Sequence, residues 1–384
     1  MGPSRHLIAA LVRQTYRSLK GEMEKQMLGS KSVLVIGTGT IGEPLIGLLC
    51  NFKAQLGIDE VLFHKRTPLM TDRSKVQNLL RRGAHLVTDK DRVAGFEEMG
   101  LKVEHITEDA MEAARVVVDC TPSGNDMKES LYKKYEDNTD LFIAQGSEFG
   151  FGKQYARGIN DEVLDVSKDK YLQIVSCNTH NLSVLIKMFG IADQGPENLT
   201  EGRFICMRRS NDISQDDKFV PSPQVGNHKD LRFGTHHARD AWHLYQTKGA
   251  EYDLNLFSSA MKMNSQLMHI IQFTMKVEKP VTREEVLQRV HDDDRVAVTY
   301  KTTANSVFSF GRDHGFNGRI LNQSVMPIDT IHVSEDGKTI SGYCFTPQDG
   351  NSLLSSVAAT VWGLYPETYD KIVQCLAPYF FQEV

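Results

Sequence analysis

The chain has 384 residues, 40% of them hydrophobic and 24% charged, with a formal net charge of -5 at pH 7. This length exceeds what one hydrophobic core usually serves, so two domains are expected. The mild, mixed charge gives no reason to expect a nucleic acid or a membrane surface as partner. Six widely separated cysteines without a Cys-x-x-Cys pair argue against a zinc module or a disulfide framework, so no metal is expected and a cytoplasmic location is favoured.

The first 30 residues are expected to form a helical extension. The apolar stretch from Leu7 to Val12 is too short to cross a membrane, and no small-residue cleavage site follows it. We interpret it as one face of an N-terminal helix that extends to about Leu28.

A strand, a glycine-rich turn and a helix follow. The β-branched run from Ser32 to Ile36 leads into Gly37-Thr38-Gly39-Thr40-Ile41-Gly42, and an apolar helical pattern continues through Leu49. In a dinucleotide-binding fingerprint such glycines allow the tight turn, the approach of a pyrophosphate and close packing of helix on strand. A glycine turn without a ligand is the alternative. The predicted cofactor contacts here are Gly37, Gly39, Thr40, Ile41 and Gly42.

The second strand, expected from Glu60 to His64, ends in basic residues. An NAD site usually has an acidic side chain at this point, whereas Lys65 and Arg66 suit the 2′-phosphate of NADP. The sequence therefore predicts that NADP is at least accepted beside NAD, with Lys65 and Arg66 as contacts. A solvated loop edge is the alternative interpretation.

Further strands are expected at Val103 to Ile106 and at Arg115 to Asp119, alternating with helical segments as a doubly wound parallel sheet requires. The latter strand leads into the turn from Thr121 to Gly124, at the carboxyl edge of the sheet where ligands lie. Thr121 and Gly124 are therefore predicted cofactor contacts, with a tight surface turn as the alternative. This domain is expected to cover residues 31–175.

The segment Ser176-Cys177-Asn178-Thr179-His180-Asn181-Leu182 directly follows a β-rich run from Tyr171 to Val175, which places a thiol at a strand-to-helix turn. A helix N-terminus there would direct N–H groups and a positive dipole end at the sulfur, favouring thiolate and later stabilising an oxyanion. A buried structural cysteine is the alternative. A reactive cysteine beside a dinucleotide site suggests thiol-dependent aldehyde oxidation or its reverse.

Beyond Cys177 the pattern changes to a strand at Gly202 to Arg208, a polar loop from Ser210 to Arg232, a helix near His237 to Thr247, and more strands after Gln272. This pattern predicts a mixed, largely antiparallel sheet with helices on one face.

Thr282 is expected to cap a helix, and Glu285 completes a capping box. Two apolar helical runs, Ser352 to Leu364 and Pro366 to Phe380, could return to cover the first domain. The predicted class is α/β: a Rossmann-type parallel sheet, completed by residues 352–384, joined to an α+β catalytic domain of residues 176–351.

Several motifs together resemble archaeal-type (type II) glyceraldehyde-3-phosphate dehydrogenase, with the chain as a divergent member. The resemblance extends from Val33 to Leu364. The matching motifs, in order, are Gly37 to Gly42, Val116 to Gly124, Ser176 to Thr179, Arg208-Arg209, His236-His237, Leu267-Met268-His269 and Val281 to Val286.

The resemblance implies a phosphorylating aldehyde dehydrogenase. Cys177 would attack the aldehyde of glyceraldehyde 3-phosphate, hydride would pass to NADP or NAD, and inorganic phosphate would cleave the thioester. The resemblance makes His269 the general base, because an imidazole can take protons near neutral pH, whereas a buried core histidine is the alternative. Asn178 would orient the substrate oxygen. A homotetramer is implied by resemblance alone.

Substrate and inorganic phosphate require two anion sites. The adjacent pairs Arg208-Arg209 and His236-His237 supply hydrogen-bond donors for them. The resemblance assigns the histidine pair to substrate phosphate, Arg209 to the cofactor side and Gln348 to the nicotinamide. Salt-bridged surface pairs are the alternative. The predicted substrate contacts are Ser176, Cys177, Asn178, Arg208, His236 and His237.

The chain also departs from the family. Where the family continues its cysteine motif with Thr-Gly, this chain has His180-Asn181, so the local backbone or the ligand approach is expected to differ. His180 is expected to add a second titrating group beside the nucleophile. The N-terminal extension and extra residues between Arg209 and His236 are further departures. Two alternatives therefore stay open: an acyl-phosphate reductase resembling aspartate-semialdehyde dehydrogenase, and a catalytically silent dinucleotide-binding interaction protein.

Overall fold

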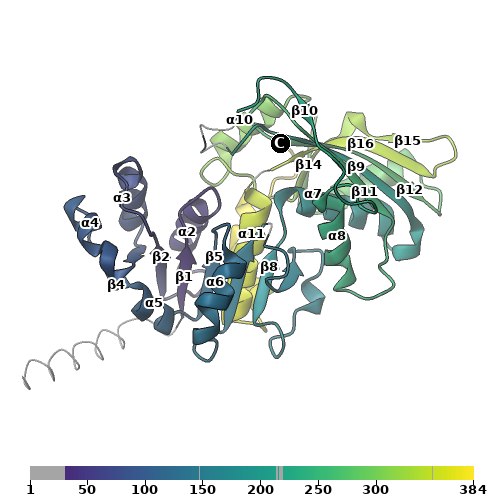
Figure 1. Ribbon diagram of the computed structural model, residues 1–384. Helices are drawn as coiled ribbons and strands as arrows, with labels where there is room; N and C mark the ends of the chain where they lie inside the picture. The colour runs from purple at the N-terminus through teal and green to yellow at the C-terminus, as the bar shows by residue number, and fades with distance from the viewer. Residues whose placement is uncertain (1–30, 147, 213–214, 216–218, 348) are drawn as a thin grey trace, which may run out of the picture.

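The computed structural model describes residues 31–146, 148–212, 215, 219–347 and 349–384, in two lobes that are each built around an eight-stranded sheet (Figure 1). The helix expected before Lys31 and the candidate cofactor residue Gln348 lie outside the described residues.

The first lobe contains an all-parallel sheet with the strand order β4-β3-β2-β1-β5-β6-β8-β7. Its strands are β1 (Ser32–Ile36), β2 (Glu60–His64), β3 (His85–Thr88), β4 (His105–Ile106), β5 (Val116–Asp119), β6 (Leu141–Gln145), β7 (Lys153–Tyr155) and β8 (Tyr171–Ile174). The order reverses between β1 and β5, and ligands of such sheets bind at that switch point. The predicted Rossmann-type sheet is confirmed.

Helices cover both faces of this sheet, so β1 and β5 are buried along their whole length. One face packs against α2 (Gly42–Asn51), α3 (Arg73–Arg81), α4 (Val93–Glu98) and α11 (Gly350–Leu364). The other face packs against α5 (Thr107–Ala113) and α6 (Gly124–Ser130). None of the helices formed by the described residues is both long and apolar enough to cross a bilayer.

The second lobe has a mixed sheet with the order β10-β11-β9-β12-β16-β14-β13, and β15 pairs with β16. Its strands are β9 (Leu199–Arg208), β10 (Gln224–Val225), β11 (Leu256–Lys262), β12 (His269–Val277), β13 (Val296–Thr299), β14 (Ser324–Pro327), β15 (His332–Val333) and β16 (Thr339–Thr346). The predicted mixed sheet is confirmed, with parallel pairs at β9–β11 and β13–β14.

One apolar core joins this sheet to three helices and a π-helical turn. These are α7 (Cys177–Leu185), its continuation Ile186–Ile191, α8 (His236–Gln246) and α9 (Arg283–Asp292). The capping box of α9, with Thr282 and Glu285, forms as predicted. A separate cluster places α10 (Ala304–His314) against β13, β14 and β16.

The C-terminal segment connects the two lobes. Helix α11, yellow in Figure 1, packs on β5, β6 and β8 and also contacts α2 and α7. After α12 (Tyr369–Val373) and a 3-10 helix (Gln374–Tyr379), the chain returns to the mixed sheet, where the N–H of Val384 donates to the carbonyl of Val298. The domain boundaries themselves stay a prediction.

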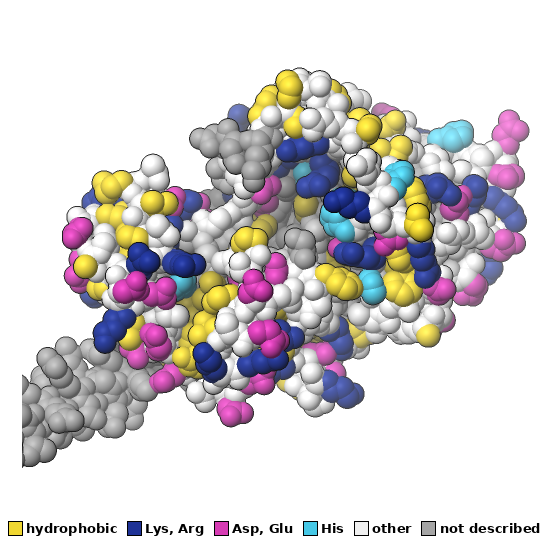
Figure 2. Space-filling model, viewed as in Figure 1, with side chains coloured by type: hydrophobic (Ala, Val, Ile, Leu, Met, Phe, Trp, Pro, Cys, Tyr) yellow, Lys and Arg dark blue, Asp and Glu magenta, His cyan; other side chains and the backbone are white. Residues whose placement is uncertain are grey.

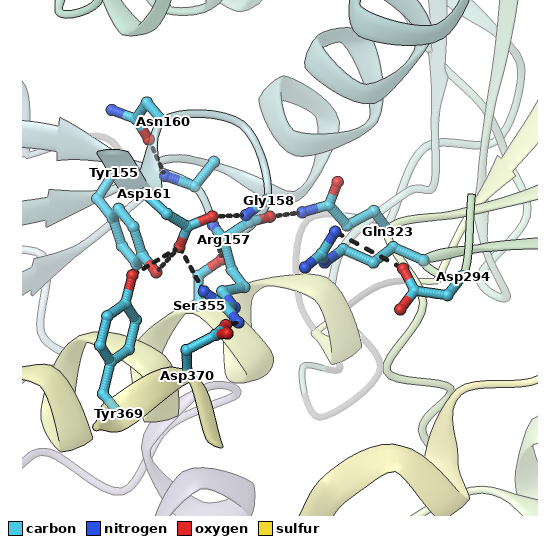
Figure 3. A network of polar contacts seen from close by, with 12 residues as sticks. Tyr155, Arg157, Gly158, Asn160, Asp161, Asp294, Gln323, Ser355, Tyr369 and Asp370 are labelled. Carbon is cyan, nitrogen blue, oxygen red and sulfur yellow. Dashed lines mark hydrogen bonds and ion pairs between the residues drawn. The ribbon is translucent and has the colours of Figure 1, made fainter. Parts of the chain in front are cut away.

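A buried polar network ties α11 and α12 to the loop after β7 (Figure 3). The guanidinium of Arg157 pairs with Asp161 at 2.8 Å and with Asp370, and it lies over the ring of Tyr369. The side chain of Gln323 donates to the carbonyl of Arg157, which brings the mixed-sheet lobe into the network. The network therefore links the two lobes through the contact of Gln323 with Arg157.

Candidate active site

A pocket of about 290 Å³ lies at the switch point of the parallel sheet. Its lining residues are Ile36, Gly37, Thr38, His64, Lys65, Arg66, Thr67, Thr121, Ser123 and Met127. The structure thus brings the glycine turn, the basic residues after β2 and the turn after β5 together. Gly124 is outside this lining, because it begins α6 and faces Ala144 and Glu148.

The three glycines of the turn are required for different physical reasons. Gly37 has φ +92°, and a Cβ on Gly42 would lie 2.1 Å from the carbonyl oxygen of Gly37, so backbone geometry and packing require both. A Cβ on Gly39 would meet no protein atom within 4 Å. This open space is where a pyrophosphate would approach the backbone, so the turn fits a dinucleotide.

Alanine substitutions separate these two roles. We expect the free energy of unfolding of Gly39→Ala to lie within about 0.5 kcal/mol of the wild-type value. The variant should bind NADP about tenfold more weakly, because the methyl group occupies the space for the pyrophosphate. Gly42→Ala should destabilise the fold by about 2 kcal/mol or more, because it forces the turn away from α2. Urea unfolding and a fluorescence titration with NADPH measure both effects. Equal NADPH affinity of Gly39→Ala and wild type would contradict the assignment.

Basic side chains surround the far end of this pocket. Lys65 forms an ion pair with Asp72 at 2.6 Å, and Lys75 lies 3.3 Å from the same carboxylate and donates to the carbonyl of Thr38. Arg66 is exposed beside them. Two lysines thus pair with Asp72, and Arg66 lines the pocket beside Lys65, a basic lining that suits a phosphate more than a ribose hydroxyl pair.

Cys177 is the first residue of α7, as predicted, and Ser176 caps this helix by accepting a hydrogen bond from the N–H of Thr179 at 3.3 Å. The predicted preference for thiolate stays a prediction, and burial opposes it. Burial raises the pKa of Cys177 to about 11, and the negative charge of Asp349 adds to the rise, while Arg209 and Arg208 oppose it. Desolvation therefore acts against the helix terminus, and a further positive charge at the site would offset it.

His269 begins β12 and is buried beside the neighbouring strand β9. Its Nδ1 accepts a hydrogen bond from the backbone N–H of Arg209 at 2.9 Å, so the neutral ring carries its hydrogen on Nε2. Burial, with Arg209 and Arg208 nearby, holds the pKa of His269 well below its usual value. In this tautomer Nε2–H is a donor available to a ligand, and the role of His269 as general base stays a prediction.

Histidine and arginine side chains cluster near the cysteine. Burial lowers the pKa of His236 to about 4 and holds the pKa of His237 well below its usual value, so the arginines carry the positive charge of this cluster. His236 and His237 begin α8 with their ring centroids 4.0 Å apart. His237 is only 3% exposed, yet neither ring nitrogen has a protein partner, and the Nε of buried Arg209 also has none. Arg208 is exposed. Unpartnered buried donors are costly, so this cluster is suited to an anionic ligand. Figure 2 shows basic and histidine side chains gathered along the hollow between the lobes.

A second pocket, of about 240 Å³, adjoins this cluster. Arg209 and Asp349 line this pocket. Apolar residues also line it, among them Phe308 of α10 and Ile320 of the loop that precedes β14. Asp349 is buried, lies 3.6 Å from Arg319 and has φ +68°. Sequence reasoning did not single out Asp349; its only signal was its place in the Thr346-Pro347-Gln348-Asp349 motif.

Asparagines of α7 connect the cysteine to the mixed sheet. The hydroxyl of Thr346 donates to Asn178 at 3.3 Å and accepts from Asn181 at 2.9 Å. Thr346 is paired with His269 in the sheet register. The side chain of Asn178 is therefore held in the same layer as His269, one residue after the thiol.

Residues 180 and 181 face inward. His180 is fully buried, with contacts to Ser176 and to Ser355 on α11. Burial lowers the pKa of His180 to about 4. The expectation of a second titrating group at the nucleophile is therefore wrong, because this ring stays neutral at physiological pH.

Buried histidines should make the fold sensitive to acid. The folded pKa of His180 lies below its unfolded value, so the unfolded chain binds more protons between about pH 4 and 6.5 and stability falls as pH drops through this window. We expect the free energy of unfolding of wild type to rise more steeply with pH than that of His180→Asn, by about 1 kcal/mol per pH unit near pH 5. Urea unfolding from pH 4.5 to 7 measures the slopes, and equal slopes would contradict a neutral His180.

Comparisons with known proteins place the chain in context. No family model matches it. It is 27% identical over 265 residues to the glyceraldehyde-3-phosphate dehydrogenase of Methanocaldococcus jannaschii, covering 65% of this chain and 71% of that protein. Proteins of the same name from Methanobacterium bryantii and Metallosphaera sedula are 29% identical over 282 residues and 27% identical over 315 residues, covering 69% and 78% of this chain and 73% and 84% of the relatives.

The fold defines a dinucleotide-binding type of α/β protein with a second, mixed-sheet lobe. Low identity over most of the chain adds a distant relationship to archaeal glyceraldehyde-3-phosphate dehydrogenases.

Proposed function

We propose that the chain is a phosphorylating, NADP- or NAD-dependent dehydrogenase that oxidises glyceraldehyde 3-phosphate to an acyl phosphate, reversibly, in glycolysis or gluconeogenesis. The observation that carries this proposal is the position of Cys177: a thiol at a helix N-terminus near Arg208 and Arg209, with the buried ring nitrogens of His237 left without protein partners in the same cluster. A cytoplasmic location and a homotetramer belong to the same proposal.

Cys177 is the proposed nucleophile. Its thiol loses a proton to solvent, and the thiolate attacks the aldehyde carbon; the resulting oxyanion is protonated to give a hemithioacetal. Loss of that hydroxyl proton to water and of hydride from carbon converts the adduct into a thioester. A bound nicotinamide dinucleotide would accept the hydride and, in its oxidised form, supply positive charge near the sulfur. Arg208 and Arg209 already lower the pKa of Cys177, so a further cation would act in the same direction.

The proposed oxyanion donors are backbone and imidazole N–H groups. The first N–H groups of α7 have no acceptor within the helix and point from its N-terminus. The Nε2–H of His269 is the available donor of its ring, because Nδ1 is occupied by the N–H of Arg209. Both would stabilise the negative oxygen of the hemithioacetal and of the tetrahedral intermediate that inorganic phosphate forms.

The substrate phosphate and the attacking phosphate require two anion sites. We assign the first site to His236 and His237; both ring nitrogens of His237 are buried without a protein partner. We assign the second site to Arg208 and Arg209. Ser176 and Asn178 complete the proposed substrate contacts next to the thiol. For the cofactor, Gly37 to Gly42, Lys65, Arg66 and Thr121 remain the proposed contacts, with Arg209 on the same side.

Cofactor reduction by the purified protein tests the proposal. We expect turnover with glyceraldehyde 3-phosphate that requires inorganic phosphate and that is faster with NADP than with NAD at equal, subsaturating concentration, because of Lys65 and Arg66. Aspartate semialdehyde serves as competing substrate. Turnover with that compound alone would favour an acyl-phosphate reductase, and NADPH binding without turnover on any aldehyde would favour a silent dinucleotide-binding protein.

A further inference from the structure

His180 holds the peptide group that precedes the proposed nucleophile. One ring nitrogen, Nδ1, lies 3.0 Å from the carbonyl oxygen of Ser176. The other, Nε2, lies 2.7 Å from the hydroxyl of Ser355 on α11. That hydroxyl accepts a hydrogen bond at 3.0 Å from the backbone N–H of Arg157, in the network of Figure 3. The chain of contacts therefore runs from the lobe-connecting network to the residue before Cys177.

The donors in this chain can be assigned. The Ser176 carbonyl is only an acceptor, so Nδ1 must carry the ring hydrogen and donate to it. Nε2 is then an acceptor, and the Ser355 hydroxyl donates to it while accepting from Arg157. Every group in the chain is satisfied in one tautomer. A fully buried ring with both nitrogens bonded cannot change its orientation without breaking a bond.

The consequence reaches Cys177 through the peptide plane. The carbonyl of Ser176 also accepts the helical hydrogen bond from the backbone N–H of His180 at 2.9 Å, so the ring supplies a second bond to the same oxygen. This carbonyl and the N–H of Cys177 belong to one planar unit, so the second bond further restrains the direction of the N–H. A hydrogen bond to the carbonyl also polarises the unit and strengthens the N–H as a donor. The next carbonyl, that of Cys177, is held by Asn351 at 3.0 Å, again from α11. Both peptide groups that flank the thiol are therefore anchored to one helix.

We propose that His180 is a positioning residue that aims the Cys177 N–H as an oxyanion donor, through its hydrogen bond to the Ser176 carbonyl. This inference rests on the proposed role of Cys177 as nucleophile. His180 itself touches neither the sulfur nor a ligand site. Its effect should appear only in reactions of the thiol that build negative charge on a carbonyl oxygen.

Two reactions of the same thiol isolate this effect. Acylation by p-nitrophenyl acetate passes through a tetrahedral oxyanion, whereas alkylation by iodoacetamide displaces iodide without one. Both rates are measured at pH 9 on the folded, full-length protein, with Cys177→Ser as the background for the other cysteines. The burst of p-nitrophenolate counts the reactive sites, so partial misfolding is corrected for. Neither probe depends on the natural substrate, so this test can succeed or fail independently of the dehydrogenase assay.

A matched pair of variants replaces one ring nitrogen at a time. His180→Asn places an amide near Nδ1 and keeps a donor for the Ser176 carbonyl, whereas His180→Gln places its amide near Nε2 and keeps a partner for Ser355. We expect His180→Gln to lower the acylation rate per reactive site about tenfold, less than the roughly hundredfold loss from removing an oxyanion donor outright. His180→Asn should stay within about threefold of wild type, and alkylation should be unchanged in both.

A purely structural role for His180 predicts a different pattern. Both variants would then lose thermal stability while acylation and alkylation per reactive site stayed in their wild-type ratio. A wild-type ratio of acylation rate to alkylation rate in His180→Gln would overturn the proposal. An equal loss of acylation in both variants would overturn it as well. A ratio that falls only in His180→Gln supports it, whether or not glyceraldehyde 3-phosphate is the substrate.

Discussion

Replacing Cys177 by serine is expected to reduce kcat for aldehyde oxidation by at least about a thousandfold, with NADPH affinity and stability near wild type. Serine fills almost the same volume, so the packing of α7 changes little. Its hydroxyl, however, is a far weaker nucleophile at neutral pH and leaves an acyl intermediate poorly. Steady-state kinetics, an NADPH titration and urea unfolding measure the three quantities.

Cys375→Ser is the matched control for that substitution. Cys375 is also partly buried and free, but it lies in the C-terminal 3-10 helix, far from α7 in sequence and packed on the first lobe. Its replacement should leave kcat within about twofold of wild type. If Cys177→Ser kept most of its activity, or if both variants lost activity equally, Cys177 would not be the nucleophile.

The second large effect is expected at His269. His269→Asn should lower kcat about a hundredfold while KM changes little, because the variant loses the Nε2–H donor that acts only on the developing oxyanion. Stability should stay near wild type, because the amide oxygen of asparagine can accept the Arg209 N–H in place of Nδ1. His269→Leu leaves that buried N–H unsatisfied and should cost a further 1–3 kcal/mol or so of stability.

The pH profile distinguishes a donor from a base at His269. Because burial holds the pKa of His269 well below its usual value, we expect titration of the thiol, not of this ring, to control the rise of kcat/KM with pH. A rise in kcat/KM with an apparent pKa near 6.5 in wild type, absent from His269→Asn, would show instead that this ring titrates as the base.

Local patterns predicted the first lobe well. The run from Ser32 to Ile36, the glycine turn and the strand from Glu60 to His64 all formed as expected, because a buried parallel strand needs a continuous apolar run and the turn needs its glycines. The strand expected from Val103 shrinks to His105–Ile106, which pairs only with β3 at the sheet edge. Strands β3 and β6 were not singled out, since strands of four or five residues with so few apolar positions are an ambiguous signal.

The sequence predicted which residues form the site, but only partly their protonation and tautomeric states. Cys177, His269, Arg209 and the histidine pair do cluster. The strand-to-helix turn pointed to Cys177, and the family resemblance pointed to the others. What sequence could not show depends on residues far along the chain: the N–H of Arg209 sets the tautomer of His269, and Ser355 makes His180 a core residue. The high pKa of Cys177 likewise follows from burial between the lobes.

The central claim is that Cys177 carries the acyl group between oxidation and phosphate attack. The most direct measurement mixes the protein with NADP and glyceraldehyde 3-phosphate in the absence of phosphate, records NADPH by absorbance and identifies the adduct by mass spectrometry of the acid-quenched protein. We predict a burst of about one NADPH per reactive thiol and an acyl adduct on the Cys177 peptide, which disappears when phosphate is added. Absence of both burst and adduct in a protein that binds NADPH, or an adduct on another cysteine, would contradict this mechanism.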